Sequence, residues 1–188
     1  KNNEFRDVLN NAELLTADGI GVVYASKILG KPIAERAAGY DIACEVLERI
    51  KGTSHSVFLF GGKPGVAEIA EEKLKERYPG LVIAGKRNGY FKPEDEEDIV
   101  NEINTTGADL VFVCLGAPKQ ELWIDKYKDK LTAKVAMGIG GSLDVFAGTA
   151  LRAPEFYCKH GLEWFYRLMK QPSRAGRMLA LPKFGLTV

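Results

Sequence analysis

The pattern of apolar and polar residues along the chain changes repeatedly between the spacing of buried strands and that of amphipathic helices. Two continuous apolar runs, residues 57–60 and 110–115, are typical of strands that are buried on both faces of a sheet. Shorter apolar segments predict three further strands, over residues 13–17, 81–84 and 133–137. Apolar residues at helical spacing predict helices over residues 5–11, 21–29, 40–51, 65–78, 93–104, 119–131 and 142–147.

The order of these elements predicts the fold class. Strands that alternate with helices form a parallel sheet, and right-handed crossover connections then lay helices on its faces. We therefore expect an α/β fold with a doubly wound, mostly parallel, Rossmann-like sheet. The composition turns basic and aromatic after Gly148. That change predicts a core domain over residues 1–148 and a helical appendage over residues 149–188.

The predicted appendage carries most of the charge asymmetry. Residues 149–188 hold seven Lys or Arg and two Glu, a net +5, which leaves −4 on residues 1–148 of a chain whose total is +1. Leu162, Phe165, Tyr166 and Met169 follow the spacing of one helical face. This helix either docks on the body of the protein or rests on an anionic membrane surface. In water, self-association into a homo-oligomer is another way to cover its apolar face.

Candidate ligand-binding residues follow four of the predicted strands. In an open α/β sheet, ligands bind beyond the carboxyl ends of the strands, and glycine there lets the backbone approach a phosphate closely. The pattern favours a nucleotide diphosphate, although tight turns alone also require glycine. The residues concerned are Asp18, Gly19, Gly61, Gly62, Gly116, Lys119, Gln120, Glu121, Gly138, Gly140, Gly141 and Asp144.

Several polar residues among these have two interpretations each. Asp18 is either a general base or a helix N-cap, and Asp41 is either a ligand or a cap. Asp144 either contacts a sugar or ribose hydroxyl or only begins a helix. Gln120 and Glu121 either bind a sugar or are polar first-turn residues that the helix dipole favours.

Other kinds of chemistry have little support in the sequence. Gly61-Gly62-Lys63 is no Walker A motif, and the glycines at 138–141 lack full dinucleotide-binding spacing. The two histidines are isolated, and three scattered cysteines favour a reducing compartment. We therefore expect no metal and no cofactor. The acidic body and the lack of a nucleic-acid-binding motif argue against nucleic acid as a partner. The chain starts at Lys1 without an initiator Met, and we expect natural residues to precede it.

Five segments taken together resemble the WecG/TagA/CpsF family of glycosyltransferases, most of all its TagA branch. They are TADGIGVV (16–23), GKPIAERAAGYD (30–41), GAPKQELW (116–123), GIGGSLDVFAG (138–148) and RAP…LEWFYRL…PSRAGR (152–177). The resemblance implies transfer of N-acetylmannosamine from a UDP-sugar donor to an undecaprenyl-diphosphate-linked N-acetylglucosamine acceptor. It further implies inversion at the anomeric carbon, no metal, and a product that is the linkage disaccharide of wall teichoic acid.

The resemblance also implies roles for individual residues. Asp18 corresponds to the catalytic base and Gln120 to an active-site residue. Arg167, Arg174 and Arg177 correspond to arginines that complete the site and stabilise the UDP leaving group. The appendage is expected to order at the membrane, which places the enzyme in the cytoplasm, peripheral on the inner face of the cell membrane. Family members carry a Thr-x-Asn motif ahead of the ADG segment. This chain starts after that point, so we expect acceptor-site residues to be missing.

Two alternatives stay open at the level of sequence. A related transferase of the same family would use UDP-N-acetylmannosamine uronic acid or UDP-glucose, because a similar diphosphate cradle serves all three donors. A dinucleotide-dependent oxidoreductase would use the glycines at 138–141, although their spacing argues against it.

Overall fold

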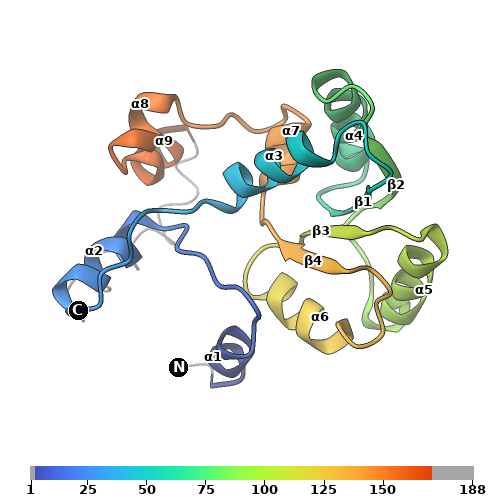
Figure 1. The fold of residues 1–188 in the computed structure, drawn as a ribbon, viewed down its shortest axis with the longest axis horizontal. Coiled ribbons are helices and arrows are strands. Elements are labelled where there is room, and N and C mark those ends of the chain that lie inside the picture. The colour runs from blue at the N-terminus through green and yellow to red at the C-terminus, as the bar shows by residue number, and fades with distance from the viewer. Residues whose placement is uncertain (1–2, 171–188) are drawn as a thin grey trace. The chain divides into compact units, whose positions relative to one another are not determined.

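The computed structural model describes residues 3–170 of the chain, without the side chains of Glu155, Lys159, Arg167 and Lys170 (Figure 1). Its contacts divide the described residues into two compact units, residues 3–15 with 39–150 and residues 16–38 with 151–170. The elements are α1 (Asn3–Asn10), α2 (Ile20–Ile28), α3 (Gly39–Ile50), β1 (Ser56–Gly61), α4 (Val66–Arg77), β2 (Val82–Arg87), a 3₁₀ turn (Pro93–Asp95), α5 (Glu96–Thr106), β3 (Leu110–Cys114), α6 (Lys119–Tyr127), β4 (Val135–Gly138), α7 (Ser142–Phe146), α8 (Glu155–Lys159) and α9 (Glu163–Lys170).

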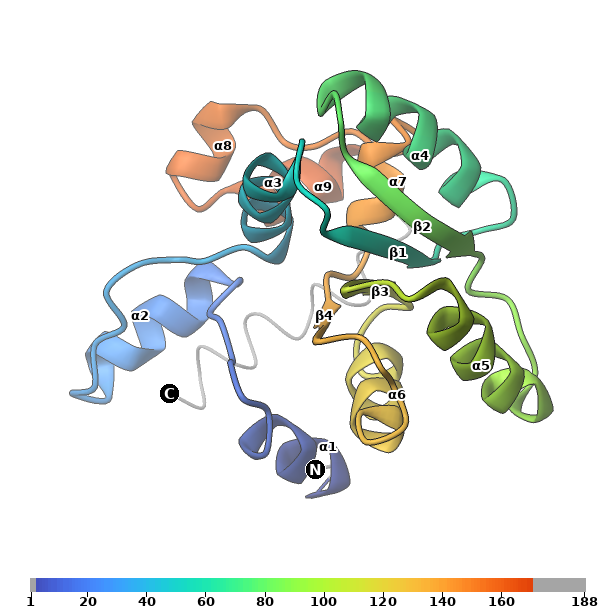
Figure 2. The same cartoon turned by 45° about the vertical axis from the view of Figure 1, so that its right-hand side comes forward.

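The first unit contains a four-stranded sheet in the order β2-β1-β3-β4, and each neighbouring pair of strands is parallel. Helix α4 connects β1 to β2, α5 connects β2 to β3, and α6 connects β3 to β4. Figures 1 and 2 show α4 and α7 on one face of this sheet and α5 and α6 on the other. The predicted doubly wound, parallel α/β fold is therefore confirmed.

Burial on both faces explains why β1 reads as an uninterrupted apolar run. Successive side chains of a strand point to opposite faces. Val57 and Leu59 accordingly pack with α3, α4 and α7, whereas Phe58 and Phe60 pack with α5 and α6. All four side chains are fully buried. Each contributes about 1.5–3 kcal/mol to folding, so both faces of the sheet are anchored at this strand.

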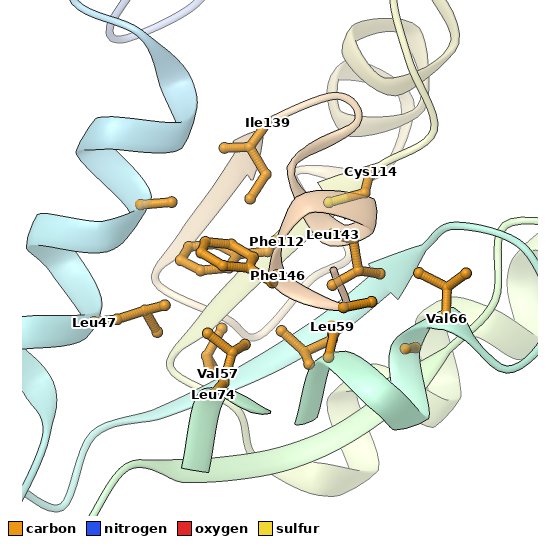
Figure 3. Packing of buried hydrophobic residues seen from close by; sticks show 14 of the residues in the cluster. Leu47, Val57, Leu59, Val66, Leu74, Phe112, Cys114, Ile139, Leu143 and Phe146 are labelled. Atoms are coloured by element: carbon orange, nitrogen blue, oxygen red, sulfur yellow. The ribbon is translucent and has the colours of Figure 1, made fainter. Parts of the chain in front are cut away.

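The core on the first face is centred on β3 and α7. Phe112 of β3 and Phe146 of α7 lie in the middle of it, with Leu47 of α3 and Leu74 of α4 nearby (Figure 3). The ring of Phe146 also stacks on Tyr40 at the start of α3, with ring centres 4.9 Å apart. Helix α7 is only five residues long and is held by this packing.

The core on the second face is largely aromatic. Phe60 of β1 packs against Trp123 of α6, with ring centres 4.9 Å apart, and Trp123 packs in turn against Tyr127. Ile99 and Ile103 of α5 complete the layer. Trp123 is thus a core residue of the first unit.

The strand predicted over residues 13–17 is wrong. This segment has no regular secondary structure, and the described sheet begins only at Ser56. Leu14 and Leu15 are 79% and 62% exposed. A strand needs a neighbour that pairs with its backbone, and a short apolar segment specifies no such partner. The local apolar pattern alone therefore does not predict the structure of this segment correctly.

The second unit is built from two segments that are far apart in the sequence. Residues 16–38 contain α2 and a return loop, in which the Ser26 hydroxyl accepts a hydrogen bond from the Ile33 N–H at 2.9 Å. Residues from 151 onward contribute α8 and α9. The backbone at Gly161 is packed so closely on Ile20 that a Cβ there would lie 2.7 Å from the Ile20 side chain. The domain boundary expected near Gly148 stays a prediction.

Candidate active site

The topology of the sheet places the expected ligand edge of the first unit at the carboxyl ends of β1 and β3. The chain runs outward from β1 to β2, then crosses back so that β3 lies on the other side of β1. A crevice for ligands in an open α/β sheet lies at such a reversal. Gly61 ends β1 there, Gly62 directly follows it, and Gly116 follows β3. The topology thus brings together three of the predicted glycines.

Gly61 is required by packing. Its φ is +135°, and a Cβ at this position would lie 2.3 Å from the Cys114 carbonyl oxygen. The Gly62 N–H donates to the same carbonyl at 3.3 Å, and the Gly62 carbonyl accepts from the Gly89 N–H at 2.9 Å. The close approach of β1, β3 and the loop after β2 accounts for both glycines without a ligand. A binding role for them stays a prediction.

Gly116 and Gly140 differ from Gly61 in their surroundings. Both have a positive φ, +78° and +56°, and a Cβ on either would meet no atom within 4 Å. Their backbones therefore border open space after β3 and β4. Gly138, at the end of β4, instead faces the amide of Gln120, which would lie 2.8 Å from a Cβ there.

Gln120 connects these loops through its side-chain amide. Its Oε1 accepts hydrogen bonds from the N–H groups of Gly116 at 3.2 Å and Gly140 at 2.9 Å. Its Nε2 donates to Glu121 Oε1 at 2.8 Å. The side chain is buried, with 5% of the residue exposed. Gln120 lies in the first turn of α6, as the sequence predicted. Its side chain is buried and hydrogen-bonded within the protein, so it is not an exposed polar residue at a helix start.

Glu121 has one carboxylate oxygen bonded to Gln120 and a second that is buried. No hydrogen-bond partner for this Oε2 atom is found among the described residues. Lys119, which begins α6, lies over the Phe91 ring with its ammonium nitrogen 3.9 Å from the ring centre. It also reaches the Gly89 carbonyl at 3.5 Å. The start of α6 therefore ties the loop after β2 to the loops after β3 and β4.

The other predicted ligands of the first unit lie at helix starts. Asp41 is exposed in the first turn of α3, where the helix dipole favours a carboxylate. Asp144 is the third residue of α7, and its backbone carbonyl accepts the Thr149 N–H at 3.0 Å. Gly141 directly precedes α7 with a φ of −79°, a value open to any residue. Binding roles for Asp41, Asp144 and Gly141 stay predictions.

Cys114 at the end of β3 is a core residue. Its burial raises the pKa of the thiol to about 12. The thiol is therefore protonated at neutral pH and is a poor nucleophile. Within residues 3–170, no group of three or more His, Cys, Asp or Glu side chains is arranged to hold a metal ion.

Asp18 belongs to the second unit and lies just before α2. The N-cap residue of α2 is Gly19, and no side chain caps this helix. The N-cap interpretation of Asp18 is therefore wrong. Its side chain is 67% exposed, and its Oδ1 lies 3.1 Å from Arg36 Nη2. Arg36 also donates from Nε to the Asp18 backbone carbonyl.

Arg36 is the residue that sequence reasoning missed. Its Nη2 bonds both Asp18 and Glu163 Oε2, the latter at 2.6 Å. The side chains of Arg36 and Glu163 are 19% and 14% exposed, so this pair is shielded from most solvent. Arg36 lies in the segment GKPIAERAAGYD, which carries part of the family resemblance. The resemblance of this segment to the family is the sequence signal that could have identified Arg36.

The tail arginines are only partly within the described structure. Arg167 lies in α9, but its side chain is outside the described atoms, and Arg174 and Arg177 lie outside the described residues. Phe165 and Met169 of α9 are exposed. None of the helices within residues 3–170 has the length and apolar character that a membrane span requires.

Comparison with known proteins gives matches over almost the whole chain. A Bacillus spizizenii protein is 41% identical over 98% of this chain and 71% of its own length. A Bacillus subtilis protein is 39% identical over 100% and 73%, and one from Staphylococcus aureus is 39% identical over 96% and 70%. All three are named N-acetylglucosaminyldiphosphoundecaprenol N-acetyl-beta-D-mannosaminyltransferase.

The family-level comparison agrees with these relatives and with the fold. The model of the glycosyl transferase WecG/TagA/CpsF family matches residues 1–188. The five segments that carry the resemblance include Asp18, Arg36 and Gln120, whose side chains make the contacts described above. The chain therefore belongs to the WecG/TagA/CpsF family of glycosyltransferases.

Proposed function

We propose that this glycosyltransferase moves N-acetylmannosamine from UDP-N-acetylmannosamine to N-acetylglucosaminyl-diphosphoundecaprenol, forming the linkage unit of wall teichoic acid. The observation that carries the proposal is the identity of 39–41%, over 96–100% of this chain, with relatives named for that transfer. The parallel α/β unit with glycine loops at its strand ends supports a nucleotide-sugar donor.

In this proposal the donor diphosphate lies at the strand ends of the first unit. Gly116 and Gly140 leave space beside the backbone, as a bulky phosphorylated ligand requires. Lys119 supplies a cation at the start of α6. Glu121, with a buried carboxylate oxygen, is a candidate acceptor for hydroxyl or amide donors of the transferred sugar, a part of the donor that UDP itself lacks.

Asp18 is the general base of the proposed reaction. Its exposed carboxylate is accessible to an acceptor hydroxyl, and Arg36 holds it by Oδ1. In a single displacement, the acceptor oxygen forms a bond to the anomeric carbon while the bond to the UDP oxygen breaks. The hydroxyl proton passes to Asp18, and the anomeric configuration inverts.

UDP leaves with negative charge, which needs a positive partner. We assign this role to Arg167, Arg174 and Arg177, because a guanidinium binds phosphate oxygens through two parallel hydrogen bonds. Neither a metal nor a cofactor enters this scheme. The tail reaches the lipid-linked acceptor at the inner face of the cell membrane, with Phe165 and Met169 entering the interface and basic residues attracted to anionic lipid.

A donor panel tests the proposal. The protein, with any natural N-terminal residues restored, is incubated with a lipid-diphosphate-linked N-acetylglucosamine acceptor and with each of three donors. These are UDP-N-acetylmannosamine, its uronic acid and UDP-glucose. We expect transfer from the first alone. Efficient transfer from either of the others would reassign the enzyme to a related activity of the family.

A further inference from the structure

The three hydrogen bonds of Gln120 use both ends of its side-chain amide inside the protein. Oε1 accepts two backbone N–H groups, and Nε2 donates to Glu121. Only 5% of the residue is exposed. A residue that binds a sugar directly needs a free donor or acceptor, and here the principal polar contacts are already made within the protein.

The two N–H groups come from different loops. Gly116 lies four residues before Gln120, directly after β3, and Gly140 lies 20 residues after it, directly after β4. One carbonyl oxygen therefore fixes the spacing of two loops at neighbouring strand ends. It also turns these two N–H groups away from any ligand, so they are not the phosphate donors that free loop amides would be.

Glu121 fixes which way the Gln120 amide points. The Glu121 carboxylate oxygen lies 2.8 Å from Nε2 and is the one acceptor that the described residues offer to the NH₂ group. A rotation of the amide by 180° would place NH₂ against two N–H donors and the carbonyl against a carboxylate. Every contact in the flipped state is repulsive, so Glu121 keeps the loop-binding orientation.

We propose that Gln120 is a positioning residue, oriented by Glu121, which clamps the loops after β3 and β4 at the spacing that the donor diphosphate needs. The ligand in this statement rests on the proposed function, whereas the clamp itself rests only on the hydrogen bonds. Gly138 is part of the arrangement, because a side chain there would displace the Gln120 amide.

The test exchanges the side-chain amide and the carboxylate between positions 120 and 121. In Gln120→Glu, two carboxylates face each other where an amide donated to a carboxylate, so the clamp opens. In the double variant Gln120→Glu/Glu121→Gln, the carboxylate still accepts both N–H groups and the new amide donates to it. The double variant keeps the net charge of the wild type and restores each hydrogen bond.

Two measurements test the clamp and the binding of the donor separately. Hydrogen exchange at the amides of Gly116 and Gly140, measured by NMR without ligand, should become roughly tenfold faster or more in Gln120→Glu. It should return toward the wild-type rate in the double variant. The affinity for UDP should fall by roughly tenfold in the single variant and recover to within about threefold in the double variant.

Asn104 provides a matched control. Its side-chain amide also joins two segments, donating to the Lys130 carbonyl at 2.8 Å and accepting from the Thr132 N–H at 2.8 Å. These contacts precede β4 and so lie away from its carboxyl end. Asn104→Asp should therefore alter local exchange near Thr132 while the affinity for UDP stays at the wild-type value.

Three outcomes would overturn the clamp. The first is unchanged exchange at Gly116 and Gly140 in Gln120→Glu. The second is a double variant whose glycine exchange is not restored. The third is restored exchange without restored affinity, which would mean that the side chains at positions 120 and 121 bind the donor directly. If the wild type does not bind UDP, the proposed function fails, but the exchange data still decide whether the clamp exists.

Discussion

Arg36 Nη2 lies 2.6 Å from Glu163 Oε2, although 127 residues separate the two in the sequence. The same guanidinium nitrogen lies 3.1 Å from Oδ1 of Asp18. One arginine thus joins the proposed base to helix α9 of the tail within the second unit. The contact gives a physical reason for the base and the tail to depend on each other.

Removing the charge of Glu163 should loosen α9 from residues 16–38. The Arg36–Glu163 pair is largely shielded from solvent, and a hydrogen bond between charged groups in such a place contributes about 1.5–3 kcal/mol. Glu163→Gln should speed hydrogen exchange in α2 and α9. Glu45→Gln, which breaks the exposed pair with Arg49, should leave these rates unchanged. If both variants showed the same exchange rates in α2 and α9, the coupling of α9 to residues 16–38 through Glu163 would be contradicted.

Replacing the proposed base should affect chemistry far more than binding. Asp18→Asn keeps the shape of the side chain but cannot take a proton, so kcat should fall by about 10²–10⁴-fold. The affinity for UDP, measured by calorimetry, should change by less than threefold or so. Asp125→Asn, at a surface ion pair with Lys128, serves as the control and should keep full turnover. Normal turnover by Asp18→Asn would exclude it as the base.

Gly61→Ala should destabilise the first unit strongly. The new methyl group would lie 2.3 Å from the Cys114 carbonyl at a positive φ, so both overpacking and backbone strain contribute. Together these cost about 2–5 kcal/mol. Gly141→Ala introduces the same methyl group into open space at an ordinary φ and should cost less than about 1 kcal/mol. Urea denaturation of both variants provides the comparison.

Acid should weaken the contacts of Asp109, which precedes β3 and joins it to Ser56 at the start of β1 and to Lys134 just before β4. Lys134 and the Ser56 N–H bond the carboxylate of Asp109 and lower its pKa to about 2. Because an unfolded Asp has a pKa of about 3.9, the stabilisation is complete above that pH and is lost as the pH falls toward 2. Asp109→Asn should flatten the dependence of the melting temperature on pH across this window. Asp129→Asn, at an exposed position, should retain the wild-type slope.

Chelation of divalent ions should leave turnover unchanged if arginines neutralise the leaving UDP. Arg177→Lys keeps the charge but loses the two-pronged phosphate contact, so kcat should fall by roughly tenfold or more. Initial rates with and without EDTA, for wild type and variant, measure both effects. A strict Mg²⁺ requirement would contradict the arginine scheme.

The fold was predictable because its central strands are buried on both faces. Val57–Phe60 alternate between two cores, so every position is apolar and the run needs no long-range information to be recognised. Edge positions carry a weaker signal. Strand β2 extends to Arg87, beyond its predicted end, and Lys86 within it pairs with Glu71 of α4 at 2.7 Å. Because the side chains at this end of the strand are polar, the apolar pattern does not reveal it.

The gathering of glycines at one sheet edge was predictable, but the contacts between the loops that carry them were not. Glycines after strands indicate an edge where a backbone can approach a ligand, and the topology gathered Gly61, Gly62 and Gly116 there. The sequence did not show that the Cys114 carbonyl alone requires Gly61, nor that Gln120 bonds Gly140. Such contacts depend on register and on loop conformation, which residue spacing does not specify.

The discontinuous origin of the second unit bears on how shortened versions of the enzyme behave. A chain cut at Gly148 keeps α2 but loses Gly161, whose backbone packs on Ile20, and Glu163, which pairs with Arg36. The remaining segment would leave Ile20 uncovered, and Arg36 would keep Asp18 but lose the other of its two acidic partners. Inactivity of such a truncate would then report damage around Asp18 as well as missing lipid attachment, so point changes on α9 dissect the tail more cleanly than deletion.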